Sequence, residues 1–267
     1  LNAQNAASQV LDAHLKQLER SDPKLRRADQ PLQGVIIHVD VQSGEIRALI
    51  GGRDYDRSQF NRALSAKRQV GSLFKPFVYL TALEQGYTAS DTVFDGPLSI
   101  VIDPHQPPYR PVNYDSKFHG IVTFRKALEH SYNIPAIRVA EMVGLSRVIE
   151  TAHRLGVRQN LRAYPSLALG AFEVSLVELT SAYTVFANQG LAFSPYLIER
   201  VTDSNGDVLE QTHPDAREVE SPQASYQLLQ ILRGVTQRGT GISAARLKLH
   251  IAGKTGTTND FTDAWFI

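Results

Sequence analysis

The chain has 267 residues, of which 42% are hydrophobic and 21% are charged, a balance typical of a soluble globular protein that buries a core. Its 28 Lys and Arg against 27 Asp and Glu give a net charge of +1, which predicts no general attraction to nucleic acid or to an anionic membrane surface. No cysteine is present, so disulfides, thiolate nucleophiles and thiolate metal sites are excluded from this stretch.

The sequence contains no run of about 18 apolar residues, so it predicts no transmembrane helix. Residues 1–20 also lack the charged-then-apolar order of an export signal. The chain begins and ends abruptly, and the apolar run 264–267 is typical of a strand that has barely started. We therefore expect a piece of a longer protein, with any membrane attachment in segments absent from it.

Apolar periodicity predicts the first elements of the chain. Apolar side chains recur at spacings of three and four over residues 3–20, which indicates an amphipathic helix. A charged, proline-containing linker follows at residues 21–31. Two β-rich runs at residues 34–41 and 45–50 flank a short turn, the pattern of a hairpin whose strands are largely buried.

An apolar segment at residues 73–83 is compatible with a helix, and Ser72 before it supplies a hydroxyl suited to a helix start. Pro76 fits such a helix only in its opening turn. Residues 91–114 are rich in Pro, Asp and Gly, which favours loops and short strands.

Further elements are expected downstream. Ser175 and Glu178 have the spacing of a capping box, and the helix that they open would end at Gly190. An Asn-Gly turn predicts a hairpin within residues 195–209. Apolar alternation predicts a half-buried strand at residues 247–251. The other helical patterns cover residues 126–128, 134–143 and 225–236.

Ser72 and Lys75 form the first candidate site, an S-x-x-K motif. Residues three apart on a helix share a face, so the Lys75 amine can reach the Ser72 hydroxyl. A serine is a poor nucleophile until a base removes its proton, and a lysine acts as that base only if burial or nearby charge lowers its pKa. Taken alone, the motif is more often a capped helix with a surface lysine.

Ser131 and Asn133 form a second motif, S-x-N. In a turn between two helices both polar groups could point into one cleft, where the hydroxyl relays a proton and the amide holds a substrate carbonyl. In isolation, the motif is more often a helix-start serine with a solvated asparagine.

Lys254, Thr255, Gly256 and Thr257 form a K-T-G-T segment at a strand edge. The cation can bind a carboxylate, the hydroxyls add hydrogen bonds, and the glycine permits a close approach to the backbone. A strand ending in a turn would also account for the segment. A phosphate-binding loop is excluded, because its pattern requires a glycine where Lys248 stands.

The three motifs occur in one chain in the order S-x-x-K, S-x-N, K-T-G. With S-D-N in place of S-x-N, this set is the mark of penicillin-binding proteins and serine β-lactamases. The sequence resembles the class A penicillin-binding proteins, the bifunctional peptidoglycan synthases, over nearly its whole length. The segments that carry the resemblance are Gly71-Ser-Leu-Phe-Lys-Pro76, Ser131-Tyr-Asn-Ile-Pro135, Leu167-Ala-Leu-Gly-Ala-Phe-Glu-Val174, Gln237-Arg-Gly-Thr-Gly241, Ala252-Gly-Lys-Thr-Gly-Thr-Thr-Asn259 and Asp263-Ala-Trp-Phe266.

The resemblance implies an α/β (α+β) fold of the penicillin-binding transpeptidase and serine β-lactamase type. In this fold a mainly antiparallel sheet is flanked by helices, the serine helix lies in the middle, and the K-T-G strand forms one wall of the cleft. Residues 1–33 would form an N-terminal helix and linker, and residues 34–267 the transpeptidase domain. The family's last strand and terminal helix are missing, so we expect the fragment to need that portion to cover its sheet edge.

The implied mechanism is that of a serine D,D-transpeptidase. By resemblance, Ser72 attacks the carbonyl between the last two D-alanines of a peptidoglycan stem peptide and becomes acylated. Lys75 would be the base, Ser131 the proton relay to the leaving amine, and Asn133 would hold the substrate amide. An amine from a neighbouring stem would then resolve the acyl-enzyme.

The K-T-G-T segment is implied to bind substrate through Lys254, Thr255, Gly256 and Thr257. Lys254 and the two hydroxyls would bind the terminal carboxylate of the stem peptide. The backbone N–H groups of Ser72 and Thr257 match the family's oxyanion hole, in which the loss of one donor costs on the order of a hundred- to a thousandfold in rate.

The resemblance also names the expected partners, which are the stem peptide, its acceptor amine and the β-lactam antibiotics that mimic the D-alanyl-D-alanine end. No cofactor, metal or nucleic acid is expected, since the 8 histidines form no metal-binding cluster. The parent protein is expected to work outside the cytoplasmic membrane, anchored by segments that this chain lacks, and to carry a glycosyltransferase domain as well.

Two other functions remain open. A β-lactamase or D,D-carboxypeptidase would share the motifs but pass the acyl group to water. The E-x-x-L-N motif that activates this water in class A β-lactamases does not occur, and a loop and a helix cap explain Glu173 and Glu178 better. A non-catalytic peptidoglycan-binding scaffold would keep the fold alone, and nothing at the motif positions favours it.

Overall fold

The computed structural model describes residues 2–26, 31–102, 104–257 and 262–267. The chain folds into two compact units and passes twice through each of them. The first unit comprises Leu1–Arg68 and Val174–Glu218, and the second comprises Gln69–Glu173 and Val219–Ile267. Two short strands, β3 (Lys67–Gln69) and β6 (Glu173–Ser175), lie where the chain changes unit. None of the described helices is both long and apolar enough to cross a membrane.

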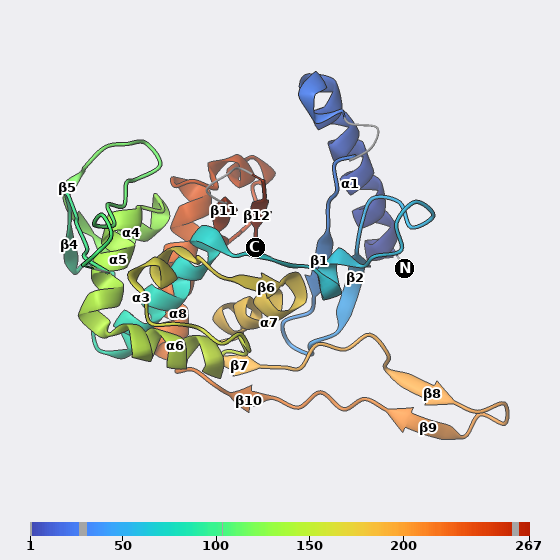
Figure 1. Cartoon of the computed structure of the whole chain (residues 1–267). Coiled ribbons are helices and arrows are strands. Elements are labelled where there is room, and N and C mark those ends of the chain that lie inside the picture. Colours follow the sequence, from blue (N-terminus) through green and yellow to red (C-terminus); the bar gives the residue numbers. More distant parts are fainter. Residues whose placement is uncertain (1, 27–30, 103, 258–261) are drawn as a thin grey trace. The chain divides into compact units, whose positions relative to one another are not determined.

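The first unit combines helices with paired strands (Figure 1). Its strands pair antiparallel as β1 with β2, β7 with β10 and β8 with β9. Helix α1 packs against β2, and α7 packs against β1. The elements are α1 (Asn2–Ser21), η1 (Pro23–Leu25), β1 (Ile36–Val39), β2 (Ile46–Ile50), α2 (Arg62–Ser65), α7 (Leu176–Ala187), β7 (Leu191–Ala192), β8 (Arg200–Thr202), β9 (Val208–Gln211) and β10 (Arg217–Glu218).

Most predictions for this unit are confirmed. The helix expected at residues 3–20 is α1, the two expected hairpins are β1–β2 and β8–β9, and η1 forms within the expected linker. Residues 27–30 of that linker lie outside the described residues. The expectation that the first hairpin is largely buried is wrong, because only Ala48 and Ile50 of its two strands are buried. In the part of the chain that the structure describes, β1 and β2 form a two-stranded sheet, which only an isolated bridge between Glu45 and Tyr196 flanks.

The capping box predicted for α7 is confirmed at Ser175, whose hydroxyl accepts a hydrogen bond from the Glu178 backbone N–H at 3.4 Å. The helix ends at Ala187, before the expected Gly190. Gly190 has a φ of 91°, and its N–H bonds back to the Val185 carbonyl at 3.0 Å. This bond closes a Schellman motif, so Gly190 caps the C-terminus of the helix as predicted.

The second unit is mainly helical. Its strand pairs are antiparallel, β4 with β5 and β11 with β12. The elements are η2 (Gly71–Phe74), α3 (Lys75–Glu84), β4 (Thr92–Asp95), β5 (Gly120–Thr123), α4 (Phe124–Glu129), α5 (Asn133–Val143), α6 (Leu145–Arg154), η3 (Pro165–Leu169), α8 (Pro222–Gln237), η4 (Ile242–Leu247), β11 (Thr255–Thr257) and β12 (Ala264–Phe266).

Helix α3 is the centre of the second unit, as expected for the helix that follows the serine. Every residue from Lys75 to Leu83 is buried, and the helix packs against α4, α5, α6 and α8, which surround it in Figure 1. Burial of each large apolar side chain contributes about 1.5–3 kcal/mol. Pro76 lies in the first turn, where its missing N–H costs no helical hydrogen bond. The surrounding core therefore holds the start of α3 rigidly.

The other helical predictions in this unit are confirmed with shifted ends. Residues 134–143 lie in α5, residues 126–128 in α4 and residues 225–236 in α8. Helix α8 starts earlier than expected, because the Ser221 hydroxyl accepts a hydrogen bond from the Ala224 N–H at 3.2 Å and caps it. The loops and short strands expected at residues 91–114 include β4.

Two local predictions for this unit are wrong. The Ser72 hydroxyl caps no helix, because the chain enters α3 through the 3-10 turn η2, and neither element has a side-chain cap. Residues 247–251 form no strand. Lys248 has a left-handed φ of 55°, Leu249 is exposed, and the Gly253 N–H bonds to the Leu232 carbonyl of α8 instead of to a strand.

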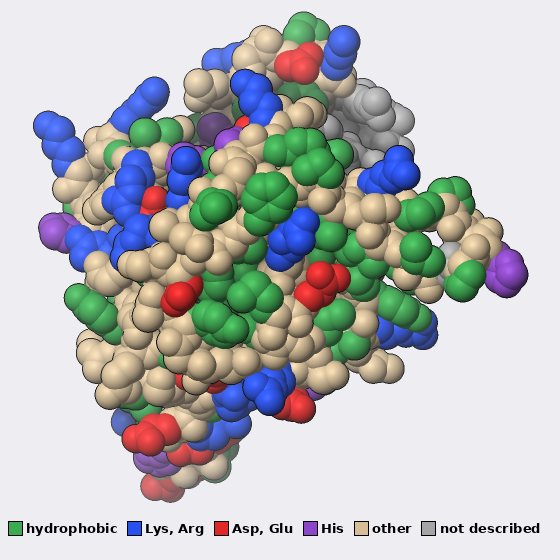
Figure 2. Space-filling model, turned by 90° about the vertical axis from the view of Figure 1, so that its left-hand side faces the viewer, with side chains coloured by type: hydrophobic (Ala, Val, Ile, Leu, Met, Phe, Trp, Pro, Cys, Tyr) green, Lys and Arg blue, Asp and Glu red, His purple; other side chains and the backbone are tan. Residues whose placement is uncertain are grey.

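The β4–β5 side of the second unit exposes large apolar side chains. Figure 2 shows hydrophobic side chains interleaved with Lys and Arg on the face seen from that side. Phe94, Val112 and Ile121 are more than half exposed. These residues therefore add little to the core, which is built around α3 instead.

Candidate active site

Ser72 is positioned by tight backbone contacts on both sides of η2. Gly71 has a φ of 57°, and its N–H bonds to the Gly170 carbonyl at 3.1 Å. A Cβ atom on Gly170 would lie 2.2 Å from the Gly71 carbonyl oxygen, and one on Gly71 would lie 2.7 Å from that of Thr257. Both glycines therefore allow a backbone packing around Ser72 that no side chain could enter. The Ser72 hydroxyl makes no hydrogen bond within the described ranges.

Lys75 is fully buried in the first turn of α3. Its Nζ donates hydrogen bonds to the Ser131 carbonyl at 2.5 Å, to Asn133 Oδ1 at 2.7 Å and to Ser131 Oγ at 3.2 Å. All three acceptors belong to the S-x-N motif. The first two motifs therefore form one hydrogen-bonded group.

Ser131 lies in the turn between α4 and α5, as expected. It adopts a left-handed φ of 58°, an uncommon conformation for a non-glycine residue that is often found at functional sites. Its N–H bonds to the Leu128 carbonyl at 3.1 Å, and the Tyr132 N–H bonds to the Ala127 carbonyl at 2.9 Å. The end of α4 thus holds the turn and directs the Ser131 hydroxyl toward the lysines.

Lys254 completes this group from the third motif. It is fully buried, and its Nζ donates to Ser131 Oγ at 2.8 Å and to the Thr255 carbonyl at 3.0 Å. Its backbone pairs with Ile267 through hydrogen bonds of 2.7 and 3.1 Å. The strand pair β11–β12 therefore holds the lysine against the Ser131 turn.

Gly256 and Thr257 of the K-T-G-T segment lie beside the turn that carries Ser72. A Cβ atom on Gly256 would lie 2.8 Å from Leu73 Cγ, so the missing side chain lets β11 approach η2. The Thr257 backbone lies close to Gly71. The two N–H groups expected to form the oxyanion hole, those of Ser72 and Thr257, therefore belong to adjacent segments. Thr258 and Asn259, which belong to the same sequence segment, lie outside the described residues.

Burial lowers the pKa of both lysines, and charge repulsion lowers that of Lys75 further. Burial holds the pKa of Lys75 well below its usual value of 10.5, and the charge of Lys254 lowers it further. Burial alone lowers the pKa of Lys254 to about 7. A buried ammonium loses its hydration, and two of them repel each other. Both effects favour the neutral amine of Lys75, which is the form that a base requires.

The sequence predictions named no role for Thr240, Glu129 or Arg238, although the Gln237–Gly241 segment contributed to the resemblance. The Thr240 and Thr255 hydroxyls lie 2.6 Å apart. Arg238 forms an ion pair with the buried Glu129 through both of its carboxylate oxygens, and the Thr240 N–H bonds to the Glu129 carbonyl at 3.1 Å. These contacts join the end of α4 to the K-T-G strand. No local pattern marks them, because the partners lie far apart in the sequence.

The comparison with known families agrees with the geometry. Residues 34–266 match the profile of the penicillin binding protein transpeptidase domain. Penicillin-binding protein 1A of Aquifex aeolicus is 44% identical over 237 residues, which cover 88% of this chain and 32% of that protein. Penicillin-binding protein 1A of Neisseria meningitidis serogroup B is 40% identical over 244 residues, covering 88% and 31%. The chain thus spans about a third of the length of these curated relatives.

Solved structures show the same fold. The crystal structure of penicillin-binding protein 1A from Haemophilus influenzae matches with a TM-score of 0.81 and 31% identity, over 88% of this chain and 41% of that one. The penicillin-binding protein PonA1 from Mycobacterium tuberculosis matches with a TM-score of 0.79 and 21% identity, over 99% of this chain and 69% of that one. These matches confirm the predicted fold class. The chain belongs to the penicillin-binding protein transpeptidase domain family.

Proposed function

We propose that this chain is a serine D,D-transpeptidase domain that cross-links peptidoglycan stem peptides through an acyl-enzyme on Ser72. The observation that carries the proposal is the convergence of two fully buried lysines, Lys75 and Lys254, on the Ser131 hydroxyl. Burying two amines beside each other lowers the stability of the fold. An arrangement so costly is characteristic of a site that moves protons.

In the first step Ser72 Oγ attacks the carbonyl carbon between the last two D-alanines, and its proton passes to the neutral amine of Lys75. The oxyanion that forms accepts hydrogen bonds from the backbone N–H groups of Ser72 and Thr257. The carbon–nitrogen bond then breaks, and the leaving D-alanine amine takes a proton through Ser131. The products are free D-alanine and an ester on Ser72.

In the second step an amine of a neighbouring stem attacks the ester. Its proton returns through the same lysine–serine group, and Ser72 regains its hydroxyl. Lys254 in its ammonium form, with Thr255 and Thr257, holds the terminal carboxylate of the donor stem, and Asn133 holds its amide. Gly256 keeps that strand close to η2, because a side chain there would meet Leu73.

The same chemistry makes β-lactams inhibitors of this chain. Penicillin-binding protein A of M. tuberculosis, which shares the fold, has been solved as acyl-enzyme complexes with penicillin G and imipenem. We extend acylation by β-lactams to Ser72 here. The substrate is a cell-wall peptide, so we place the domain outside the cytoplasmic membrane, anchored by other parts of its parent protein, which would also polymerise glycan.

Intact-mass spectrometry after incubation with benzylpenicillin tests the proposal on the full-length protein. Wild type should gain the mass of one penicilloyl group, and Ser72→Ala should gain none. Ser90→Ala, which removes an exposed serine of the same unit, should be acylated like wild type. Antibiotic destruction without a lasting adduct would instead indicate a β-lactamase or carboxypeptidase. The absence of both adduct and turnover would indicate a non-catalytic scaffold.

A further inference from the structure

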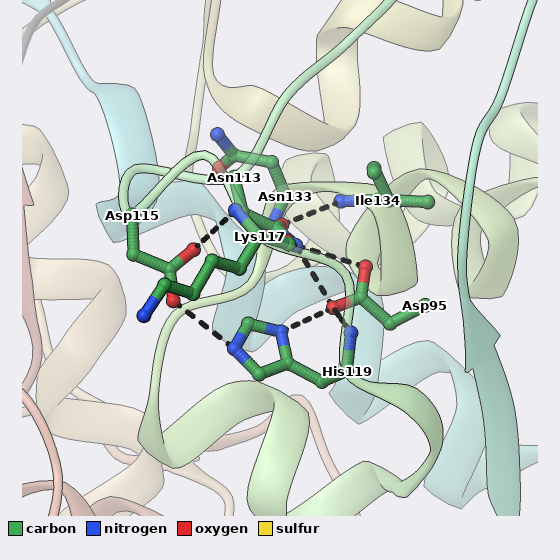
Figure 3. Close-up of polar contacts among 7 residues, drawn as sticks. All are labelled: Asp95, Asn113, Asp115, Lys117, His119, Asn133 and Ile134. Atoms are coloured by element: carbon green, nitrogen blue, oxygen red, sulfur yellow. Dashed lines mark hydrogen bonds and ion pairs between the residues drawn. The ribbon is translucent and has the colours of Figure 1, made fainter.

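Helix α5 begins at Asn133, within the S-x-N motif, and its own N-cap residue Tyr132 makes no side-chain cap. The first N–H groups of a helix need acceptors from elsewhere. The Asn113 side chain provides one from twenty residues upstream. Its Oδ1 accepts hydrogen bonds from the Asn133 N–H at 2.8 Å and from the Ile134 N–H at 3.4 Å (Figure 3).

The Asn113 amide is held in one orientation by its other contacts. Its Nδ2 donates to Asp95 Oδ1 at 2.9 Å, to Asp95 Oδ2 at 2.8 Å and to the Lys117 carbonyl at 2.8 Å. Carboxylate and carbonyl oxygens only accept, so the amide cannot flip without losing these bonds. The residue before Asn113 also holds the motif, because the Val112 carbonyl accepts from Asn133 Nδ2 at 2.7 Å.

Asp95 is fully buried at the end of β4. Besides Asn113, it accepts hydrogen bonds from the His119 backbone N–H at 3.1 Å and meets His119 Nδ1 at 2.6 Å. No Lys or Arg forms an ion pair with it in the part of the chain that the structure describes. A buried carboxylate costs free energy unless it is fully hydrogen-bonded, so the contacts from Asn113 and His119 stabilise it where it lies.

His119 also contacts the S-x-N motif directly, through Tyr132. Its ring stacks on Tyr132 with centroids 4.0 Å apart and planes 13° apart. Its Nε2 lies 3.0 Å from Asp115 Oδ2, so the ring is fixed between two carboxylates. Tyr132 is the middle residue of S-x-N and lies between Ser131 and Asn133.

We propose that Asp95, Asn113 and His119 form a positioning cluster for the acylation of Ser72, an inference that rests on the function proposed above. The cluster fixes the start of α5, and through it the direction in which Asn133 presents its amide oxygen to Lys75. None of the three reaches Lys75 itself. They act through Asn133, whose Oδ1 accepts from Lys75 Nζ at 2.7 Å.

The test compares Asn113→Ala with wild type in the full-length protein. The measurement is acylation by a fluorescent penicillin, with a rate constant and a binding constant determined over a range of pH. The rate constant should fall about ten- to a hundredfold, because small misplacements of positioned groups cost that much. The acidic limb of the pH–rate profile should move to lower pH, because the Lys75 ammonium loses a well-placed acceptor while Lys254 still repels it. A purely structural loss would lower the melting temperature without moving this limb.

Thr151→Ala is the matched control. Thr151 is also buried and hydrogen-bonded, to Thr81 and Glu84, but these lie toward the far end of α3, which rises about 1.5 Å per residue from Lys75. This variant should lower the melting temperature and leave both the acylation rate and its pH profile as in wild type.

An exchange of the two buried partners provides a second test if Asn113→Ala does not fold. Asn113→Asp alone places two carboxylates against each other and should acylate slowly. Adding Asp95→Asn restores one donor and one acceptor between the two positions and should recover part of the rate, since the Lys117 carbonyl still lacks its donor. Equal rates in the single and the exchanged variant would overturn the proposal.

The outcomes separate this inference from the proposed function. A wild-type protein that is not acylated refutes both. A wild type that is acylated, beside a folded Asn113→Ala with the same rate and the same pH profile, refutes the positioning role alone.

Discussion

At the scale of single residues, the site depends on burying groups that water would otherwise solvate. Lys75 and Lys254 are fully buried, and each has its pKa lowered from the usual 10.5 by that burial. The sequence marked both lysines as candidates, but their spacing could not show that they are buried or that they meet at Ser131. The same burial that lowers the pKa of Lys75 should weaken the fold.

Lys254→Met should therefore raise the free energy of unfolding, and more so at pH 7 than at pH 10. The folded chain releases the Lys254 proton near pH 7, whereas the unfolded chain keeps it until about pH 10.4. Between these values the unfolded state binds more protons, so wild-type stability rises with pH, and the variant lacks the part of this dependence that Lys254 contributes. Chemical denaturation at both pH values measures the difference, with the exposed Lys67→Met as control. The expectation would be contradicted if the difference in the free energy of unfolding between Lys254→Met and wild type were as large at pH 10 as at pH 7.

At the scale of elements, short irregular segments position the two candidate serines, and the long helices support these segments. Ser72 lies in η2 and Ser131 in a turn, whereas α3 and α5 hold these segments from behind. The sequence predicted α3 and α5 well, because apolar periodicity is a local property. It missed the contact of Gly170 with Gly71, which joins residues about a hundred positions apart.

Gly170→Ala should slow acylation of Ser72 strongly. Its Cβ would meet the Gly71 backbone, so the residue that precedes Ser72 must shift. The left-handed conformation alone costs about 1–2 kcal/mol for a residue with a Cβ. Gly86→Ala separates the two effects, since Gly86 also has a positive φ, of 89°, and nothing within 4 Å of the added carbon. Fluorescent-penicillin acylation and thermal melting of both variants make the comparison, and equal acylation rates would refute the role of the close contact.

At the scale of the whole molecule, all eight candidate site residues belong to the second unit, although the chain leaves that unit and returns to it. The sequence analysis divided the chain between residues 33 and 34 on the basis of the family resemblance. The two compact units are instead defined by contacts in space. The chemistry should therefore not depend on the outlying parts of the first unit, such as the β8–β9 hairpin.

Replacing Arg200–Gln211 by Asn-Gly should leave acylation of Ser72 unchanged. The Thr212 N–H bonds to the Glu199 carbonyl at 2.9 Å, so these two residues already face each other and a two-residue turn can join them. The strand pairing of the hairpin is internal to it. The acylation rate of the shortened protein, measured beside wild type, makes the test, and a tenfold loss would show that the hairpin supports the site.

The sequence by itself determined the order of the motifs, the helices α1, α3, α5, α7 and α8, and the family, because these depend on local spacing and on residue identity along the chain. Only the tertiary structure decided that Lys254 bonds to Ser131 and that Asn113 caps α5, since each contact joins residues far apart in sequence. The alternating pattern at residues 247–251 failed for the same reason. A strand exists only where another strand pairs with it, and here the backbone turns toward α8 instead.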